Sequence, residues 1–140
     1  MARSIKWLFV YGTLLSRSRD QIGREMRRHL QTHCIKRRPA RVAGLLYDLG
    51  GYPGWVEQPG GNHWVYGEAL LLDDCGQVFQ LLDPYENFDP KRPDEGEYVR
   101  VVRQVLSRRG ERIGAWAYGY CGELVGKSSI RNGRWLSAWR

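Results

Sequence analysis

The stretch Phe9-Val10-Tyr11-Gly12-Thr13-Leu14-Leu15 lies close to the start of the chain and ends its first apolar segment. Residues 7–11 form an almost unbroken apolar and aromatic run, which is typical of a strand buried on both faces. Gly12 follows at once, and a glycine at a strand end allows unusual backbone angles and a close approach to the main chain. The segment therefore predicts either a tight strand exit or an anion site formed by the amides of Gly12, Thr13 and Leu14.

The composition indicates one ordinary globular domain. The chain has 140 residues, of which 42% are hydrophobic and 26% are charged, and a chain of this kind buries a core of its own. We expect a single domain over residues 1–140, with a core at about 5–120 and a tail at 121–140. Six Trp and eight Tyr favour a cavity or an interface lined by aromatic rings.

The net charge and the cysteines indicate which binding partners and which cellular compartment to expect. The formal net charge is +7, which is compatible with a polyanion ligand, but the arginines are spread along the chain without a zinc finger or an aromatic RNA-binding signature. We therefore do not expect a nucleic-acid partner. Cys34, Cys75 and Cys121 lie far apart, which predicts free thiols and a cytoplasmic protein. No apolar run approaches the roughly 18 residues of a membrane span, so no membrane partner is expected.

Hydrophobic periodicity predicts the order β-α-β-β-α-β-β. The predicted strands are 7–11, 40–49, 65–72, 98–106 and 113–120, and the predicted helices are 19–33 and 74–85. Ser18 and Gln21 have the spacing of a capping box for the first helix, and Asp74 is the expected N-cap of the second. Residues 50–55 and 87–96 are expected to form loops. Sequential strand pairs with only two helices favour an α+β domain, in which a small mixed sheet closes toward a β-barrel.

Two carboxylates are candidates for acid–base chemistry. Glu86 follows an apolar helix end and an aromatic ring, where desolvation would raise the pKa of its carboxyl; the alternative is an exposed glutamate at a helix end. Glu68 lies inside the strand predicted at 65–72, and the alternative for it is the solvent face of an edge strand. Several further acids lie in a polar loop, where we expect them to be solvated: Asp89, Asp94, Glu95 and Glu97.

His29 and His33 are four residues apart on the first predicted helix, a spacing that can bind a metal ion. The chain has no HExxH motif there and no neighbouring carboxylate in the sequence. We therefore expect no metal site.

Tyr11-Gly12-Thr13-Leu14 after an apolar strand resembles the YGTL signature of gamma-glutamylcyclotransferase-like proteins, the AIG2-like group. Further segments resemble that family in its order over about residues 5–120: Gly44–Tyr47 with Tyr52–Gly54, Gly67–Ala69, the LDxxE-like Leu82–Glu86, the YxR-like Tyr98–Arg100, and Ala117–Tyr118. Two features depart from the family pattern. Asn87 stands where the family often has glycine, and the loop from Glu86 to Tyr98 is long and acidic.

The resemblance implies that family's fold and an enzyme that cyclises a gamma-glutamyl compound to 5-oxoproline, with release of an amine or amino acid. It implies Glu86 as the general acid and base and requires no metal or organic cofactor. The substrate-binding residues it implies are Tyr11, Gly12, Thr13, Leu14, Tyr52, Tyr98 and Tyr118, with main-chain amides holding a carboxylate or an oxyanion and the tyrosines donating hydrogen bonds.

Two alternatives stay open at this point. One is a protein of the same fold that binds a small metabolite without catalysis, because a fold does not guarantee an activity. The other is a basic protein that binds a polyanion. A monomer and a homodimer are both compatible with the sequence, with Trp135 and Trp139 packing on the domain or on a second subunit.

Overall fold

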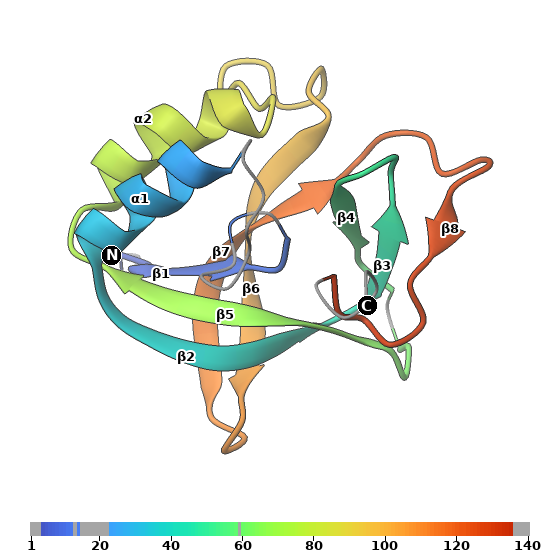
Figure 1. Ribbon diagram of the computed structural model, residues 1–140, viewed down its shortest axis with the longest axis horizontal. Coiled ribbons are helices and arrows are strands. Elements are labelled where there is room, and N and C mark those ends of the chain that lie inside the picture. Colours follow the sequence, from blue (N-terminus) through green and yellow to red (C-terminus); the bar gives the residue numbers. More distant parts are fainter. Residues whose placement is uncertain (1–3, 13, 15–22, 59, 136–140) are drawn as a thin grey trace.

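The computed structural model describes residues 4–12, 14, 23–58 and 60–135. Figure 1 shows its helices and strands. They are β1 (Trp7–Val10), α1 (Arg24–His33), β2 (Cys34–Ala43), β3 (Leu45–Asp48), β4 (Pro53–Val56), β5 (Trp64–Leu72), α2 (Cys75–Tyr85), β6 (Tyr98–Ser107), β7 (Arg112–Tyr120) and β8 (Ser128–Ser129).

Five strands close into a barrel in the order β1-β5-β2-β6-β7. The closure is made by β1, which pairs antiparallel with β5 and parallel with β7 through Trp7↔Ala115 and Leu8↔Trp116. The far end of β7 leaves the barrel and pairs with β4, which continues the sheet to β3 and β8 (Figure 1). Helices α1 and α2 lie together over one side of the barrel (Figure 1). This architecture confirms the predicted α+β fold.

The single strand predicted over 40–49 is wrong, because this region forms two strands. Strand β2 starts six residues earlier than predicted and ends at Ala43. Gly44 has a φ of 142°, and a Cβ there would lie 2.4 Å from the carbonyl oxygen of Val56. This is a bend that an L side chain resists. The chain therefore turns at Gly44 and starts β3 in a new direction.

The loop predicted at 50–55 is also partly wrong, because Pro53–Val56 form β4 and pair with β3 as a hairpin. Gly50 and Gly51 have φ values of 112° and 104°. Both amides donate to Oδ1 of Asp48, at 2.9 and 3.0 Å. Because this turn reverses the chain before Pro53, residues Pro53–Val56 can pair with β3.

The second helix confirms its prediction. Its N-cap is Asp74, whose side chain accepts a hydrogen bond from the amide of Gln77 at 3.1 Å. The first helix is described from Arg24 onward, so the predicted residues 19–22 and the capping box of Ser18 and Gln21 lie outside the described residues.

Burial follows the alternation of β1. Leu8 and Val10 pack in the cluster that joins the barrel to the helices, whereas Phe9 and Tyr11 pack in a second cluster with residues such as Trp55. The strand is therefore buried on both faces, as its unbroken apolar run predicts. The segment after β7 also reaches this second cluster, where Trp135 is 4% exposed.

No helix within the described ranges has the length and apolar character needed to cross a membrane.

Candidate active site

A cavity of about 500 Å³ opens where the end of β1, the β3–β4 turn, the end of α2 and the start of β6 meet. Its lining consists of Phe9, Val10, Tyr11, Gly12, Leu14, Gly50, Gly51, Tyr52, Pro53, Tyr85, Glu86, Glu97, Tyr98 and Tyr118. The cavity thus brings together Glu86 and every described residue of the predicted substrate-binding set, from segments far apart in the sequence, whereas Glu68, the second acid–base candidate, does not line it. The remaining member of the set, Thr13, lies outside the described residues.

The end of α2 fixes the position of Glu86. The amide of Asn87 donates to the carbonyl of Pro84 at 3.0 Å, and the amide of Phe88 donates to the carbonyl of Asp83 at 2.8 Å. These two bonds form a Schellman motif, in which the residue after the C-cap adopts a left-handed conformation. Asn87 has a φ of 55° and occupies that place. Asparagine and glycine both accept this conformation, so Asn87 preserves the backbone that a glycine would form here.

Glu86 is a half-buried carboxylate. Within the described part of the chain, no group forms a hydrogen bond or ion pair with its carboxyl, and the described lining of the cavity has no Lys or Arg. Burial, and to a smaller extent the charge of Glu97, raise the pKa of Glu86 from 4.5 to about 8. Near neutral pH this carboxyl can therefore both release and accept a proton.

The three tyrosines predicted to donate to substrate, and Tyr11 with them, already donate to the protein. The Tyr98 hydroxyl donates to the carbonyl of Pro53 and the Tyr118 hydroxyl to Oδ1 of Asp83, at 2.5 and 2.6 Å. Tyr52 donates to Oε2 of Glu97 at 2.5 Å. Tyr11 donates to the carbonyl of Tyr118 at 2.7 Å. The rings therefore form the wall of the cavity, and their hydroxyl oxygens offer lone pairs.

Burial raises the pKa of Tyr11, Tyr98 and Tyr118, so all three stay neutral. The pKa of Tyr52 rises to about 12, first because its hydroxyl is bound to Glu97. The neutral phenols add no charge to the cavity, which leaves Glu86 and Glu97 as the acidic groups in its described lining.

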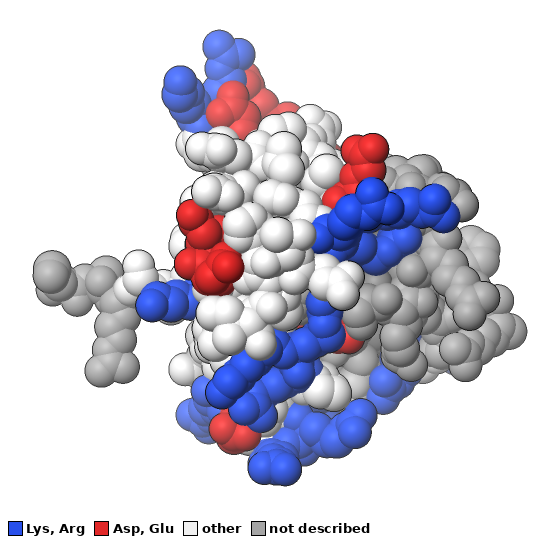
Figure 2. All heavy atoms as spheres, turned by 60° about the vertical axis from the view of Figure 1, so that its left-hand side comes forward, with Lys and Arg blue, Asp and Glu red and all other residues white. Residues whose placement is uncertain are grey.

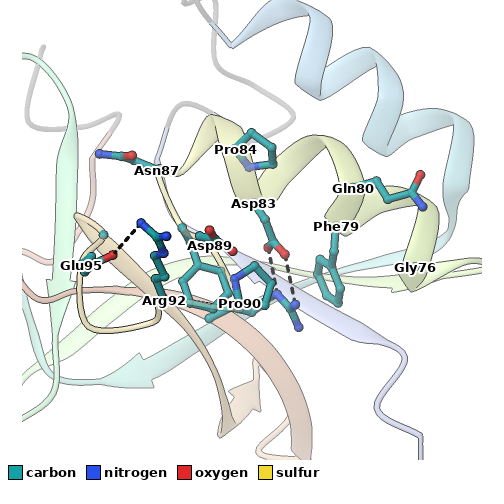
Figure 3. A pocket seen from close by; sticks show the side chains of 13 residues that line it. Gly76, Phe79, Gln80, Asp83, Pro84, Asn87, Asp89, Pro90, Arg92 and Glu95 are labelled. Carbon is teal, nitrogen blue, oxygen red and sulfur yellow. Dashed lines mark hydrogen bonds and ion pairs between the residues drawn. The ribbon is translucent and has the colours of Figure 1, made fainter.

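An ion pair supports the wall from behind. Arg100 on β6 donates through Nε and Nη2 to the two carboxylate oxygens of Asp83, at 2.9 and 3.1 Å. Its guanidinium also lies over the rings of Phe79 and Trp116, at 4.0 and 4.7 Å from their centroids. Figure 3 shows Asp83 extending from α2 toward the dashed lines of this pair, and both partners line a further pocket between α2 and the loop that follows it. Since Asp83 also holds Tyr118, the ion pair fixes one wall of the cavity.

Gly12 is required for a different reason from the one expected. Its φ lies outside the left-handed region, but a Cβ would lie 2.4 Å from Cγ of Pro53. The glycine therefore allows β4 to pack against the end of β1, and this contact holds the β3–β4 turn at the cavity mouth.

Sequence reasoning missed Glu97 and misjudged the surroundings of Glu68. Glu97 was expected in solvent, but it is half-buried and lines the cavity, because the loop folds back and the amide of Cys121 donates to its carbonyl at 3.1 Å. Its position directly before Tyr98 is the one sequence signal that could have located it. Glu68 lies on β5 between β1 and β2 and pairs with Arg37 at 3.2 Å, so it lies on no edge strand.

His29 joins the two helices, because its Nε2 lies 3.4 Å from the carbonyl oxygen of Gln77 on α2. Nδ1 of His33 lies 2.7 Å from Oδ1 of Asp73, which precedes α2, and the rings of His29 and His33 are in edge contact. Among the residues that the structure describes, no three His, Cys, Asp or Glu side chains are grouped to hold a metal ion.

Comparison with known proteins points to one family. A family model described as "Gamma-glutamyl cyclotransferase, AIG2-like" matches residues 8–137. No curated protein gives a significant sequence match.

Solved structures share the fold. Protein YkqA from Bacillus subtilis is 24% identical with a TM-score of 0.66; the alignment covers 98% of this chain but only 44% of that protein. A mouse AIG2-like protein is 21% identical with a TM-score of 0.64, covering 92% of this chain and 88% of the mouse chain. Protein YtfP from Escherichia coli is 28% identical with a TM-score of 0.60, covering 96% and 99%.

Proposed function

The chain belongs to the AIG2-like gamma-glutamyl cyclotransferase family, and from this premise we propose that it cyclises a gamma-glutamyl amide to 5-oxoproline and releases the amine. The observation that carries the proposal is the Glu86 carboxyl, which lines a cavity of about 500 Å³ with no cation among the described lining residues and has a pKa of about 8. A cavity of this size suits a small substrate.

The pKa of Glu86 matches the group on which it acts. The α-ammonium of the substrate has a pKa of about 7.7–8.0, so the proton passes between two groups of nearly equal affinity. Glu86 first takes this proton, which frees the nitrogen lone pair to attack the γ-carbonyl carbon and close the five-membered ring. It then gives the proton to the leaving nitrogen, and the bond between the carbonyl carbon and that nitrogen breaks. The ring nitrogen loses its second proton through the same carboxylate to the released amine, which leaves as an ammonium. Proton transfer of this kind contributes about 10²–10⁴-fold to a rate.

The remaining barrier depends on shape and charge. Both reacting groups belong to one molecule, and well-oriented intramolecular reactions reach effective molarities of about 10⁵–10⁸ M. The aromatic wall of Tyr11, Tyr98 and Tyr118 would hold the substrate folded for ring closure. In this proposal the main-chain amides of Gly12, Thr13 and Leu14 bind the substrate carboxylate or the oxygen that becomes negative in the transition state.

The test is to replace Glu86 with glutamine, which keeps the shape of the side chain and removes the base. A panel of gamma-glutamyl amino acids and amines is assayed for 5-oxoproline, with Glu123→Gln as the control because Glu123 is an exposed carboxylate outside the cavity lining. We expect Glu86→Gln to lose about 100-fold or more in kcat and the control to match the wild type. A Glu86→Gln variant with wild-type turnover overturns the role of Glu86. A wild-type protein that binds these compounds or 5-oxoproline without turnover overturns the enzyme in favour of a metabolite-binding protein.

A further inference from the structure

A second pocket, of about 350 Å³, lies between α1 and the start of β2. Its lining consists of Leu14, Arg24, Arg27, Arg28, Leu30, Gln31 and Arg37. We call it the arginine pocket. Leu14 also lines the cavity that contains Glu86, so the two spaces share one wall.

The helix gathers its arginines on one face. Positions 24, 27, 28 and 31 follow the i, i+3, i+4, i+7 spacing, so their side chains lie along the same side of α1. Like charges at these spacings repel, and cations in the first turns of a helix also oppose the helix dipole. Glu25, the acidic residue in the first turn, lies about 100° around the helix from Arg24. An anion in the pocket would relieve both effects.

Few carboxylates are available to neutralise the pocket. Among the described residues, Arg37 pairs with Glu68 at 3.2 Å, while neither Arg24 nor Arg28 pairs with an acidic side chain. On the face of the molecule that Figure 2 shows, Lys and Arg side chains lie in several groups, and acidic side chains lie beside some of them.

We propose that the arginine pocket binds a small phosphate-bearing molecule. Guanidinium groups present rigid forks of donors that match phosphate oxygens, and those of Arg24, Arg28 and Arg37 come from two different elements around one hollow. A groove for single-stranded nucleic acid adds aromatic side chains on which bases stack, and the described lining contains none. The occupant touches Leu14, so it lies against the wall of the substrate cavity without entering it.

Calorimetric titration with pyrophosphate tests the proposal. The double variant Arg24→Gln/Arg28→Gln removes two of the forks, and Arg108→Gln/Arg109→Gln is the control because it removes the same charge from the exposed turn between β6 and β7. We expect saturable binding of one pyrophosphate per wild-type chain, a loss of about tenfold or more in the first variant, and a change of about twofold or less in the control. The absence of saturable binding, or equal losses in both variants, overturns the site.

Two further ligands and one further variant separate the alternatives. Citrate carries a comparable charge without phosphate, and citrate binding as tight as that of pyrophosphate overturns the phosphate assignment. A single-stranded oligonucleotide tests the nucleic-acid alternative. If it binds more tightly than pyrophosphate, and both double variants weaken its binding equally, the basic side chains form a diffuse nucleic-acid surface and the phosphate site is overturned. Glu86→Gln should bind pyrophosphate as the wild type does, which makes the outcome independent of the proposed cyclotransferase activity.

Discussion

Replacing Tyr11 with phenylalanine tests how the cavity is attached to the barrel. The Tyr11 hydroxyl accepts from the amide of Trp55 on β4 at 3.1 Å and donates to the carbonyl of Tyr118 on β7 at 2.7 Å. It therefore bridges the two strands where β7 leaves the barrel, near the single register pair Trp55↔Gly119. Phenylalanine keeps the ring and leaves no cavity, so the change isolates the two hydrogen bonds.

The expected cost follows from the two backbone groups left without this partner. Each buried polar group that loses its partner costs about 1–3 kcal/mol, so we expect Tyr11→Phe to lower the free energy of unfolding by about 2–6 kcal/mol. This is a large part of the 5–15 kcal/mol that holds a typical domain together. At a urea slope of about 2 kcal/mol per molar, which is ordinary for such proteins, the midpoint should fall by about 1–3 M.

The assay is equilibrium urea unfolding followed by tryptophan fluorescence and far-UV circular dichroism. Tyr47→Phe is the matched control, because Tyr47 lies on β3 and its hydroxyl has no partner among the described residues. The control should stay within about 0.5 kcal/mol of the wild type. A Tyr11→Phe variant that does the same would refute the bridge between β4 and β7.

Three further changes probe the groups around the cavity. The pKa of Glu86 is about 8 in the folded state and 4.5 in the unfolded state, so between these pH values the native state holds an extra proton and loses stability as the pH rises. In urea unfolding from pH 5 to pH 9, Glu86→Gln should therefore gain up to about 4 kcal/mol over the wild type. A difference that stays constant with pH would contradict the burial of this carboxyl. Asn87 has a φ of 55°, so in urea unfolding Asn87→Gly should stay within about 0.5 kcal/mol of the wild type, whereas Asn87→Ala should lose about 1–2 kcal/mol of unfolding free energy. If the glycine and alanine variants are equally stable, α2 does not end in a left-handed residue. Arg100→Met leaves Asp83 buried without its cation, so in thermal unfolding it should lower the free energy of unfolding by about 3–5 kcal/mol. Adding Asp83→Asn to this variant should restore part of that loss. If the losses of the two single variants simply add in the double variant, the two side chains do not interact.

Sequence patterns correctly predicted the elements that depend on residues close by in the chain. The run at 7–11 predicted a strand buried on both faces, and Asp74 predicted the start of α2, because each signal lies within a few residues of its effect. The division of 40–49 into β2 and β3 depends on the approach of Val56 to Gly44, which is a contact made only in the fold. Periodicity alone carries no information about such contacts.

The candidate site was predictable as a set of segments but not as a set of contacts. Motif spacing named residues that the cavity then brings together, whereas the partners of their hydroxyls, such as Asp83 for Tyr118, come from other elements. Glu97 was missed for the same reason, since its place in the cavity wall depends on how the loop folds back, and its position before Tyr98 is the one sequence signal for it. The pairing of Glu97 with Tyr52 joins positions 45 residues apart.

Closure of the barrel by its first strand has a consequence for how the protein acquires its site. Tyr11 and Tyr118 are 107 residues apart in the sequence, so this contact spans most of the chain. Contacts of such long range form slowly, because the entropy of closing the loop must be overcome before they contribute. The cavity wall at β1 therefore cannot be completed before β7 has docked, and a chain with an open barrel has no partly working cavity. Refolding kinetics followed by ligand binding should accordingly show binding competence appearing in the last folding phase.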